Sequence, residues 1–303
     1  MTQQKSDAVS QQGVRSSLLV IMSQSGFMMF LQFVASVFIA RLLTPVEVGV
    51  FSVSMVLIAL GNTLRDFGVV DFVVQDRHLD QSRLRAASFL AYASSWTLAL
   101  IIWIAAPFAA AFYGLPDIRN VMWLLAINFF LTPLGTVAMA YMRRERQFNR
   151  IATIRALRGL LQSMGGVALA WWGMSYYSMA LSGIAAAILV QFLISYWWPA
   201  EVPRMPHWRG MKSIFAFGGF STLGNIIKEL DRGAPDLILG RTLDMSAVAY
   251  FGRASGLINT FNRLVIQMVM YVALPFLAKE IREDASQAAR IYLASIPMLT
   301  GVA

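Results

Sequence analysis

Five charged residues stand close together between Asn225 and Arg241, in a segment that is otherwise apolar. They are Lys228, Glu229, Asp231, Arg232 and Asp236. As one helix, Ser213 to Arg241 would be about 43 Å long at 1.5 Å per residue, which is enough to cross a bilayer. A charged side chain at mid-membrane costs on the order of 3 kcal/mol, so these groups must face protein or water. We therefore interpret the segment as a functional part of a membrane-spanning helix.

Four of these groups share one face of about 100° on a helical wheel drawn at 100° per residue. They are Lys228, Glu229, Arg232 and Asp236. Arg232 has Lys228 and Asp236 as i,i+4 neighbours, so part of the charge can be neutralised within the helix. Because Pro235 lacks the N–H that would bond one turn back, and Gly233 loosens the same turn, we expect a kink or broken turn here.

A second cationic stripe is predicted on the following span. Its members are Arg253, Thr260, Arg263 and Gln267. Together the two helices predict a cleft with more basic than acidic groups, which suits an anionic head group such as phosphate or diphosphate. The candidate substrate-binding residues are Asn225, Lys228, Arg232, Arg253 and Arg263, and the candidates for ion coupling are Glu229 and Asp236. The alternative is that these groups only pair with one another and hold helices together.

The composition places the whole chain in the polytopic, all-α membrane class. Of 303 residues, 57% are hydrophobic and 14% charged, and the mean hydropathy is +0.60. The chain has no cysteine and two histidines, both in hydrophilic connectors, so we expect no metal site and no cofactor. It also has no phosphate-binding glycine loop and no connector long enough for a catalytic domain, so we predict no enzymatic activity and no catalytic residue.

Hydropathy predicts eight spans and the beginning of a ninth. The eight are Val14 to Ala40, Val46 to Asp66, Leu84 to Tyr113, Ile118 to Tyr141, Ile151 to Gly173, Tyr177 to Trp198, Ser213 to Arg241 and Ala247 to Ala278. We divide the chain into a cytoplasmic tail (1–13), a first six-helix bundle (14–199), a linker (200–212) and an incomplete second bundle (213–303).

The net charge of +9 is distributed between the spans rather than gathered in one patch, so it indicates membrane topology and not nucleic-acid binding. Seventeen Lys and Arg fall in the loops of one side and three, Arg41, Arg119 and Arg241, on the other. This places the N-terminus in the cytoplasm. We interpret the arginine run from Arg143 to Arg158 as a topology anchor that contacts anionic membrane lipids.

A repeat with a period of 200 residues relates the two halves. Ile39 to Leu64 aligns without gaps on Leu239 to Leu264, with eight identities in 26 positions. Both copies contain the turn between two spans, and six helices separate them. We therefore predict a parallel repeat about an axis along the membrane normal, an arrangement that places the substrate between the halves in transporters.

Several stretches resemble the Wzx-type oligosaccharide flippases of the MOP (multidrug/oligosaccharidyl-lipid/polysaccharide) superfamily. They are FIARLLTPVEVGVFSVSMVL from Phe38, LRDFGVVDFVVQ from Leu64, YMRRERQFNRIATIRAL from Tyr141, DLILGRTLDMSAVAYFGRASGL from Asp236 and LPFLAKEIR from Leu274. The resemblance implies two six-helix bundles forming a V in the bacterial inner membrane. It also implies flipping of a lipid-pyrophosphate-linked oligosaccharide by alternating access, for surface polysaccharides such as O-antigen, lipopolysaccharide or exopolysaccharide, with glycan polymerase and assembly proteins as possible partners.

In the family pattern, an arginine in the seventh helix, a Gly-Arg at its end and an arginine in the eighth fall on Arg232, Gly240-Arg241 and Arg253. This chain departs from the pattern at Leu243-Asp244-Met245, where Leu-Gly-Pro is usual, and ends within the ninth predicted span, so we expect a C-terminally truncated member. Two alternatives are a MATE-like exporter of small molecules, which would favour an acidic cleft, and a non-transporting membrane partner of a glycan-assembly complex.

Overall fold

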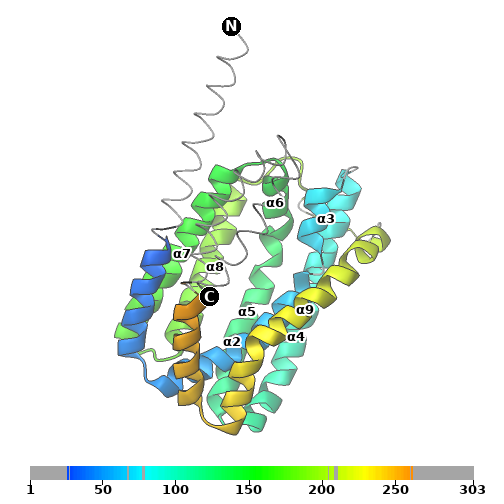
Figure 1. Ribbon diagram of the computed structural model, residues 1–303. Coiled ribbons are helices and arrows are strands. Elements are labelled where there is room, and N and C mark those ends of the chain that lie inside the picture. The colour runs from blue at the N-terminus through cyan, green and yellow to red at the C-terminus, as the bar shows by residue number, and fades with distance from the viewer. Residues whose placement is uncertain are drawn as a thin grey trace, which may run out of the picture. The chain divides into compact units, whose positions relative to one another are not determined.

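The computed structural model describes residues 26, 28–66, 68–76, 79–203, 205–207, 211–259 and 261, and these form helices joined by short turns (Figure 1). The chain divides into two compact units, Met1–Ala249 and Tyr250–Ala303. No strand occurs among the described residues. Arg263, Thr260 and Gln267 of the predicted second stripe lie outside them.

The first unit is a bundle of long helices. In chain order they are Met28–Leu42, α2 (Pro45–Asp66), α3 (Val69–Gln75), α4 (Gln81–Tyr113), α5 (Pro116–Leu131), α6 (Pro133–Arg144), α7 (Phe148–Trp171), α8 (Tyr177–Tyr196) and α9 (Met211–Thr242). A further helix begins at Met245 and covers 245–259. Within the described residues, three helices are long and apolar enough to cross a membrane, and a bent pair makes a fourth. The chain is therefore an all-α, multi-pass membrane protein, as predicted.

Two of the predicted spans are interrupted. The helix of the second span ends at Asp66, and α3 extends the span to Gln75 after Gly68, which adopts φ 69°, a left-handed conformation that glycine adopts without strain. The fourth consists of α5 and α6, which meet at 52°. Pro133 has no N–H to continue the α5 ladder, which explains the position of that bend. After the bend, α6 packs mainly against α3 and α4 and also contacts α7 and α8.

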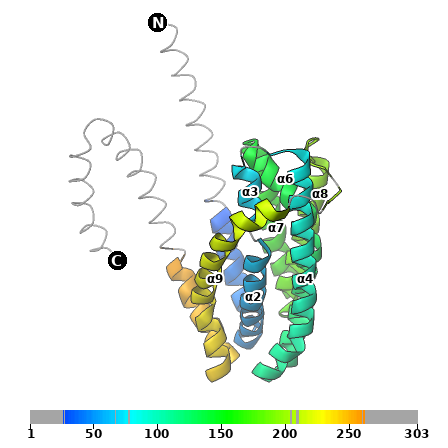
Figure 2. The same cartoon turned by 90° about the vertical axis from the view of Figure 1, so that its right-hand side faces the viewer.

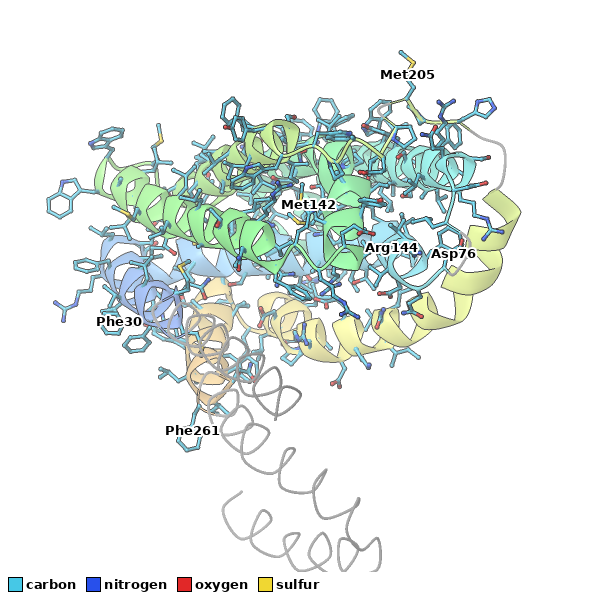
Figure 3. The ribbon with its side chains drawn as sticks, turned by 90° about the horizontal axis from the view of Figure 1, so that it is seen from above. Phe30, Asp76, Met142, Arg144, Met205 and Phe261 are labelled. Atoms are coloured by element: carbon cyan, nitrogen blue, oxygen red, sulfur yellow. The ribbon has the colours of Figure 1, made fainter. Side chains whose placement is uncertain are left out.

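The core of the unit consists of three apolar clusters. The largest joins α2, α4 and α5 around Val53, Ile118 and Phe129, and the other two surround α6. Met142, at the centre of the third cluster, is fully buried, whereas Phe30 and Met205 point outward in the view along the bundle (Figure 3).

At one end of the bundle, two carboxylates hold the turn between α7 and α8. Glu47, in the first turn of α2, accepts a short hydrogen bond from the Ser175 hydroxyl. Asp117, at the start of α5, accepts one from the Tyr176 hydroxyl at 2.7 Å. Burial, together with this hydrogen bond, raises the pKa of Tyr176 above its ordinary value. We refer to this as the Glu47 end.

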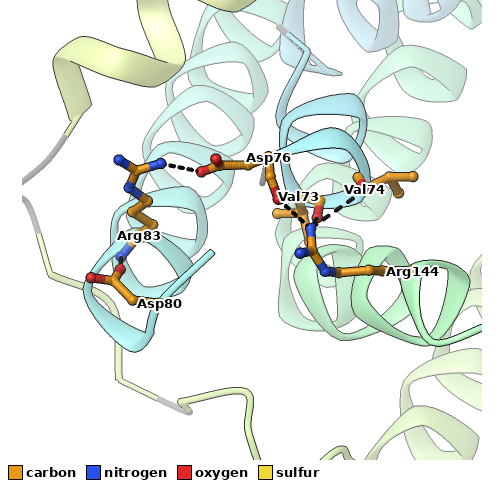
Figure 4. Close-up of polar contacts among 6 residues, drawn as sticks. All are labelled: Val73, Val74, Asp76, Asp80, Arg83 and Arg144. Carbon is orange, nitrogen blue, oxygen red and sulfur yellow. Dashed lines mark hydrogen bonds and ion pairs between the residues drawn. The ribbon is translucent and has the colours of Figure 1, made fainter. Parts of the chain in front are cut away.

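At the opposite end, which we refer to as the Arg144 end, arginines fix the short helix α3 (Figure 4). One Arg144 guanidinium nitrogen donates to the carbonyls of Val73 at 3.1 Å and Asp76 at 2.6 Å. The Asp76 carboxylate pairs with Arg83 of α4 at 2.5 Å. These contacts satisfy carbonyls that the end of α3 leaves without helical partners and tie α3 to α4 and α6.

Helix α9 runs without a break through Pro235, so the broken turn predicted there is not observed; the helix instead curves along α2 (Figure 2). A Cβ on Gly233 would lie 2.4 Å from Val56 Cγ1, and one on Gly240 would lie 3.0 Å from Val53 Cγ2. Small residues at a membrane helix interface permit this close approach. These contacts explain why α9 stays continuous at Pro235, because α2 packs against it on both sides of the proline.

The two turns related by the 200-residue period have equivalent backbone hydrogen bonds. Leu43 N donates to Ile39 O and Leu243 N to Leu239 O, each at 2.9 Å. The side chains of Thr44 and Asp244 then accept from the backbone N–H three residues on, at 3.3 and 2.7 Å. The local correspondence of the repeat is thus confirmed at these turns. The symmetry axis along the membrane normal and the bundle boundary at Ser213 stay predictions.

Candidate functional site

The bend between α5 and α6 opens a pocket of about 380 Å³ within the first unit, toward the Arg144 end. Residues of α3, α6, α7 and α8 line it. Its polar side chains are Thr132, Thr136, Arg143, Arg155, Arg158 and Gln191. The remaining lining is apolar, so three positive charges face a small space bounded largely by hydrocarbon.

Local structure explains why the three guanidiniums converge. Arg143 lies in the last turn of α6, where a cation interacts favourably with the helix dipole. Arg155 and Arg158 are three residues apart and so lie on one face of α7, which begins only four residues after α6 ends. The tight α6–α7 turn, with Arg146 at φ 55°, brings that face beside Arg143.

None of these three guanidiniums has a hydrogen bond or ion pair within the described part of the chain, and all three are exposed to the pocket or solvent. Among the residues that line the pocket, all of them described, there is no carboxylate. Arg65 of α2 adds a fourth positive charge near enough to act on Arg158. Arg143, Arg155 and Arg158 are like charges with no carboxylate among the residues that line their pocket, and this creates a strong preference for an anion.

The neutral polar groups of the pocket add hydrogen-bonding capacity. The hydroxyls of Thr132 and Thr136 donate to carbonyls of their own helix, at 2.6 and 2.9 Å, which leaves their oxygens as acceptors. Gly135 makes room for the Gln191 amide, whose Oε1 would lie 2.8 Å from a Cβ at that position. The pocket therefore combines forked cationic donors with groups that can bind hydroxyls or phosphate oxygens.

The predicted residues of α9 lie on the outside of the described first unit. Asn225, Lys228 and Arg232 are exposed, and Asp236 is half-buried. Arg232 contacts Glu229 at 3.5 Å, so the partial neutralisation predicted for this helix occurs through an i,i+3 pair and not through Asp236. Asp231 is exposed as well. The structure thus keeps Lys228 and Arg232 accessible for a ligand, and their binding role stays a prediction.

The remaining predicted residues belong to the second unit. Arg253 is half-buried on the helix 245–259 and has interactions of its own. Arg263 lies outside the described residues. A shared site of Arg253 with Arg232 accordingly stays a prediction.

The pocket was not predicted, because the run from Arg143 to Arg158 was interpreted as a topology anchor that touches anionic lipids. The sequence nevertheless contains a sign of this pocket. Arg155 and Arg158 lie a turn or more inside a long apolar segment, too deep for a loop anchor, and their i,i+3 spacing places them on one face. The bend that brings Arg143 to them has a local sign in Thr132-Pro133, but its direction depends on packing.

Comparison with known proteins identifies the family. The family model described as polysaccharide biosynthesis protein matches residues 38–303. The chain belongs to this polysaccharide biosynthesis family. The match covers every element of the pocket and α9.

Among curated relatives, the chain is 24% identical to the teichuronic acid biosynthesis protein TuaB of Bacillus subtilis (strain 168), over 78% of this chain and 51% of the relative. It is 22% identical to the lipopolysaccharide biosynthesis protein WzxC of Escherichia coli (strain K12), over 82% and 51%. It is 24% identical to the succinoglycan biosynthesis transport protein ExoT of Rhizobium meliloti (strain 1021), over 85% and 53%. The chain thus spans about half the length of these relatives. No solved structure matches it.

Proposed function

We propose that this chain forms part of a transporter that flips a lipid-pyrophosphate-linked oligosaccharide across the bacterial inner membrane for surface polysaccharide synthesis. The observation that carries the proposal is the set of three arginines in a pocket of a membrane bundle, none of which has an ion pair among the described residues. A diphosphate supplies the charge and the oxygen geometry that guanidinium groups bind best. Biosynthesis of lipopolysaccharide and transport in succinoglycan biosynthesis, named for two relatives, fit this substrate class.

The proposed orientation has the N-terminus in the cytoplasm, with the Arg144 end facing the same compartment. Lipid-linked sugars would then meet the pocket from the side on which they are assembled. Lys228 and Arg232 on α9 would provide a second cationic surface along the path, and Glu229 or Asp236 would carry a coupling ion. An exporter of organic cations is disfavoured, because Arg143, Arg155 and Arg158 would repel its substrate.

The test is a comparison of two variants of the full chain in lipid nanodiscs. Arg155→Ala combined with Arg158→Ala should weaken binding of a polyprenyl diphosphate at least tenfold, since each lost charge-assisted hydrogen bond contributes about 1.5–3 kcal/mol. Arg150→Ala is the matched control. Arg150 is an exposed arginine of the same helix that contacts Gln147 at 2.9 Å, outside the pocket. Equal binding by both variants would show that the pocket does not bind the diphosphate.

Flipping is measured separately in proteoliposomes, as protection of a fluorescent lipid-diphosphate sugar from an impermeant quencher. The proposal requires a rate above that of protein-free vesicles. It also requires that the double arginine variant lose this rate and Arg150→Ala keep it. A chain that binds the lipid but never flips it would be a membrane partner of the assembly machinery rather than a transporter.

A further inference from the structure

A polar cavity of about 260 Å³ lies within the first unit, where the helix Met28–Leu42 packs beside α7 (Figure 1). Its polar side chains are Gln32, Ser36, Gln162, Ser163 and Ser182. Glycines of α7 and apolar side chains complete the lining, and none of the lining residues, all of them described, carries a charge. The volume is several times the about 30 Å³ that one water molecule occupies in the liquid, so the cavity can hold a larger polar group.

The two glutamines of the cavity lie near the middle of the bundle. Gln32 and Gln162 precede the ends of their helices, at Leu42 and Trp171, by nearly three turns. At 1.5 Å per residue this is about 15 Å from the Glu47 end, which is half of a hydrocarbon layer of about 30 Å. A polar side chain at that depth is unfavourable against lipid, so these amides face water or a ligand.

The cavity presents both donors and acceptors of hydrogen bonds. Neither the Gln32 nor the Gln162 amide makes a hydrogen bond with another described residue. Each amide offers two N–H donors and an acceptor oxygen. The Ser36 and Ser182 hydroxyls donate to carbonyls of their own helices, at 2.7 and 3.1 Å, which leaves their oxygens as acceptors. Sugar hydroxyls, which both donate and accept, match this set of groups.

The cavity adjoins the arginine pocket along α7. Two consecutive residues, Arg158 and Gly159, line the pocket and the cavity respectively. Arg158 and Gln162 are i,i+4 neighbours on one face of the helix, about 6 Å apart along its axis. Gly159 has no side chain to separate the two spaces, and a Cβ there would clash with Met28. A group bonded directly to an anion at Arg158 would therefore be within reach of the cavity.

We propose that this cavity binds the sugar joined to the diphosphate, through hydrogen bonds between the Gln32 and Gln162 amides and the sugar hydroxyls. The inference rests on the proposed function and adds a site for the glycan. In the proposed substrate the diphosphate is bonded directly to a sugar, so an uncharged hydrogen-bonding space beside the cationic pocket matches the order of the two groups. Phe51 of α2, half-buried at the cavity wall, supplies an apolar surface for the face of the sugar ring.

The experiment uses the full chain in nanodiscs and two lipids, a polyprenyl diphosphate and the same lipid carrying one hexose. The wild-type protein should bind the hexose-bearing lipid about fivefold more tightly, because the amides add hydrogen bonds to the sugar. Gln32→Leu combined with Gln162→Leu removes the amides at similar side-chain volume. This double variant should lose the preference and bind the bare diphosphate lipid as the wild type does.

Gln147→Leu is the matched control and should keep the preference. Gln147 precedes α7 and accepts a hydrogen bond from Arg150 at 2.9 Å, outside both the cavity and the pocket. A second measurement needs no variant. A diazirine on the hexose should cross-link to α7 between Gly159 and Gly166 and to the helix Met28–Leu42, and labelling confined to other helices would overturn the assignment.

The two proposals fail separately in these measurements. If Arg155→Ala combined with Arg158→Ala leaves binding of both lipids unchanged, the proposed anion site fails, and the preference for the hexose still decides on the cavity. Equal binding of the two lipids by the wild type would show that the cavity holds only water. An equal loss of both lipids in the glutamine double variant would show that the amides support the fold and not the sugar.

Discussion

Arg144 and Arg150 belong to one basic run, yet their side chains have different surroundings. Arg144 is half-buried and donates to the carbonyls at the end of α3, whereas Arg150 is exposed and contacts Gln147. Arg144→Ala would leave those carbonyls without a donor, and we expect a loss of about 2 kcal/mol in the free energy of unfolding. Arg144→Lys should recover part of it and Arg150→Ala should change little. Thermal unfolding in detergent measures all three, and equal stability of Arg144→Ala and Arg150→Ala would contradict the assigned role.

The exposed face of α9 is testable residue by residue because the chain has no native cysteine. A thiol reacts through its thiolate, which requires water. Lys228→Cys and Arg232→Cys should react with an impermeant thiol reagent. Leu230→Cys, exposed on the opposite and apolar side of the helix, should not. Similar reactivity at all three positions would show that α9 does not separate water from lipid.

At the scale of the elements, close contacts between helices depend on individual glycines. A Cβ on Gly49 of α2 would lie 1.9 Å from the Met245 carbonyl oxygen, so Gly49→Ala must push α2 away from the second repeated turn. We expect a loss of about 1–3 kcal/mol in unfolding free energy. Gly183→Ala in α8, where nothing lies within 4 Å, is the matched control and should be neutral or stabilise by about 0.5–1 kcal/mol. If both substitutions have the same effect, the contact between α2 and Met245 is looser than described.

At the scale of the whole molecule, the repeated turns predict the topology. The turns at Thr44 and Asp244 have the same backbone and capping geometry, and a parallel repeat places them on the same side of the membrane. Thr44→Cys and Asp244→Cys should both be labelled by an impermeant reagent from outside intact cells, and Arg150→Cys only after permeabilisation. Labelling of Thr44→Cys and Asp244→Cys from opposite sides would exclude a parallel repeat.

Much of the fold could be predicted because hydropathy and loop chemistry act locally. A run of about 20 apolar residues crosses a bilayer as a helix, because a helix satisfies all backbone groups within the segment. The sequence by itself therefore determined the all-α membrane class, the spans at α2, α4, α5–α6 and α8, and the correspondence of the Thr44 and Asp244 turns. The length of α3 and the direction of the bend at Pro133 were not predicted, because each depends on the helix against which it packs.

The sequence alone could not decide which arginines form a site. Arg143 and Arg155 look alike as members of a basic run, and only the tight α6–α7 turn and the packing of α6 and α7 bring them to one pocket. Continuity of α9 through Pro235 likewise depends on α2. Electrostatic function depends on distances and on the absence of counter-charges among groups far apart in sequence, and only the tertiary structure supplies these.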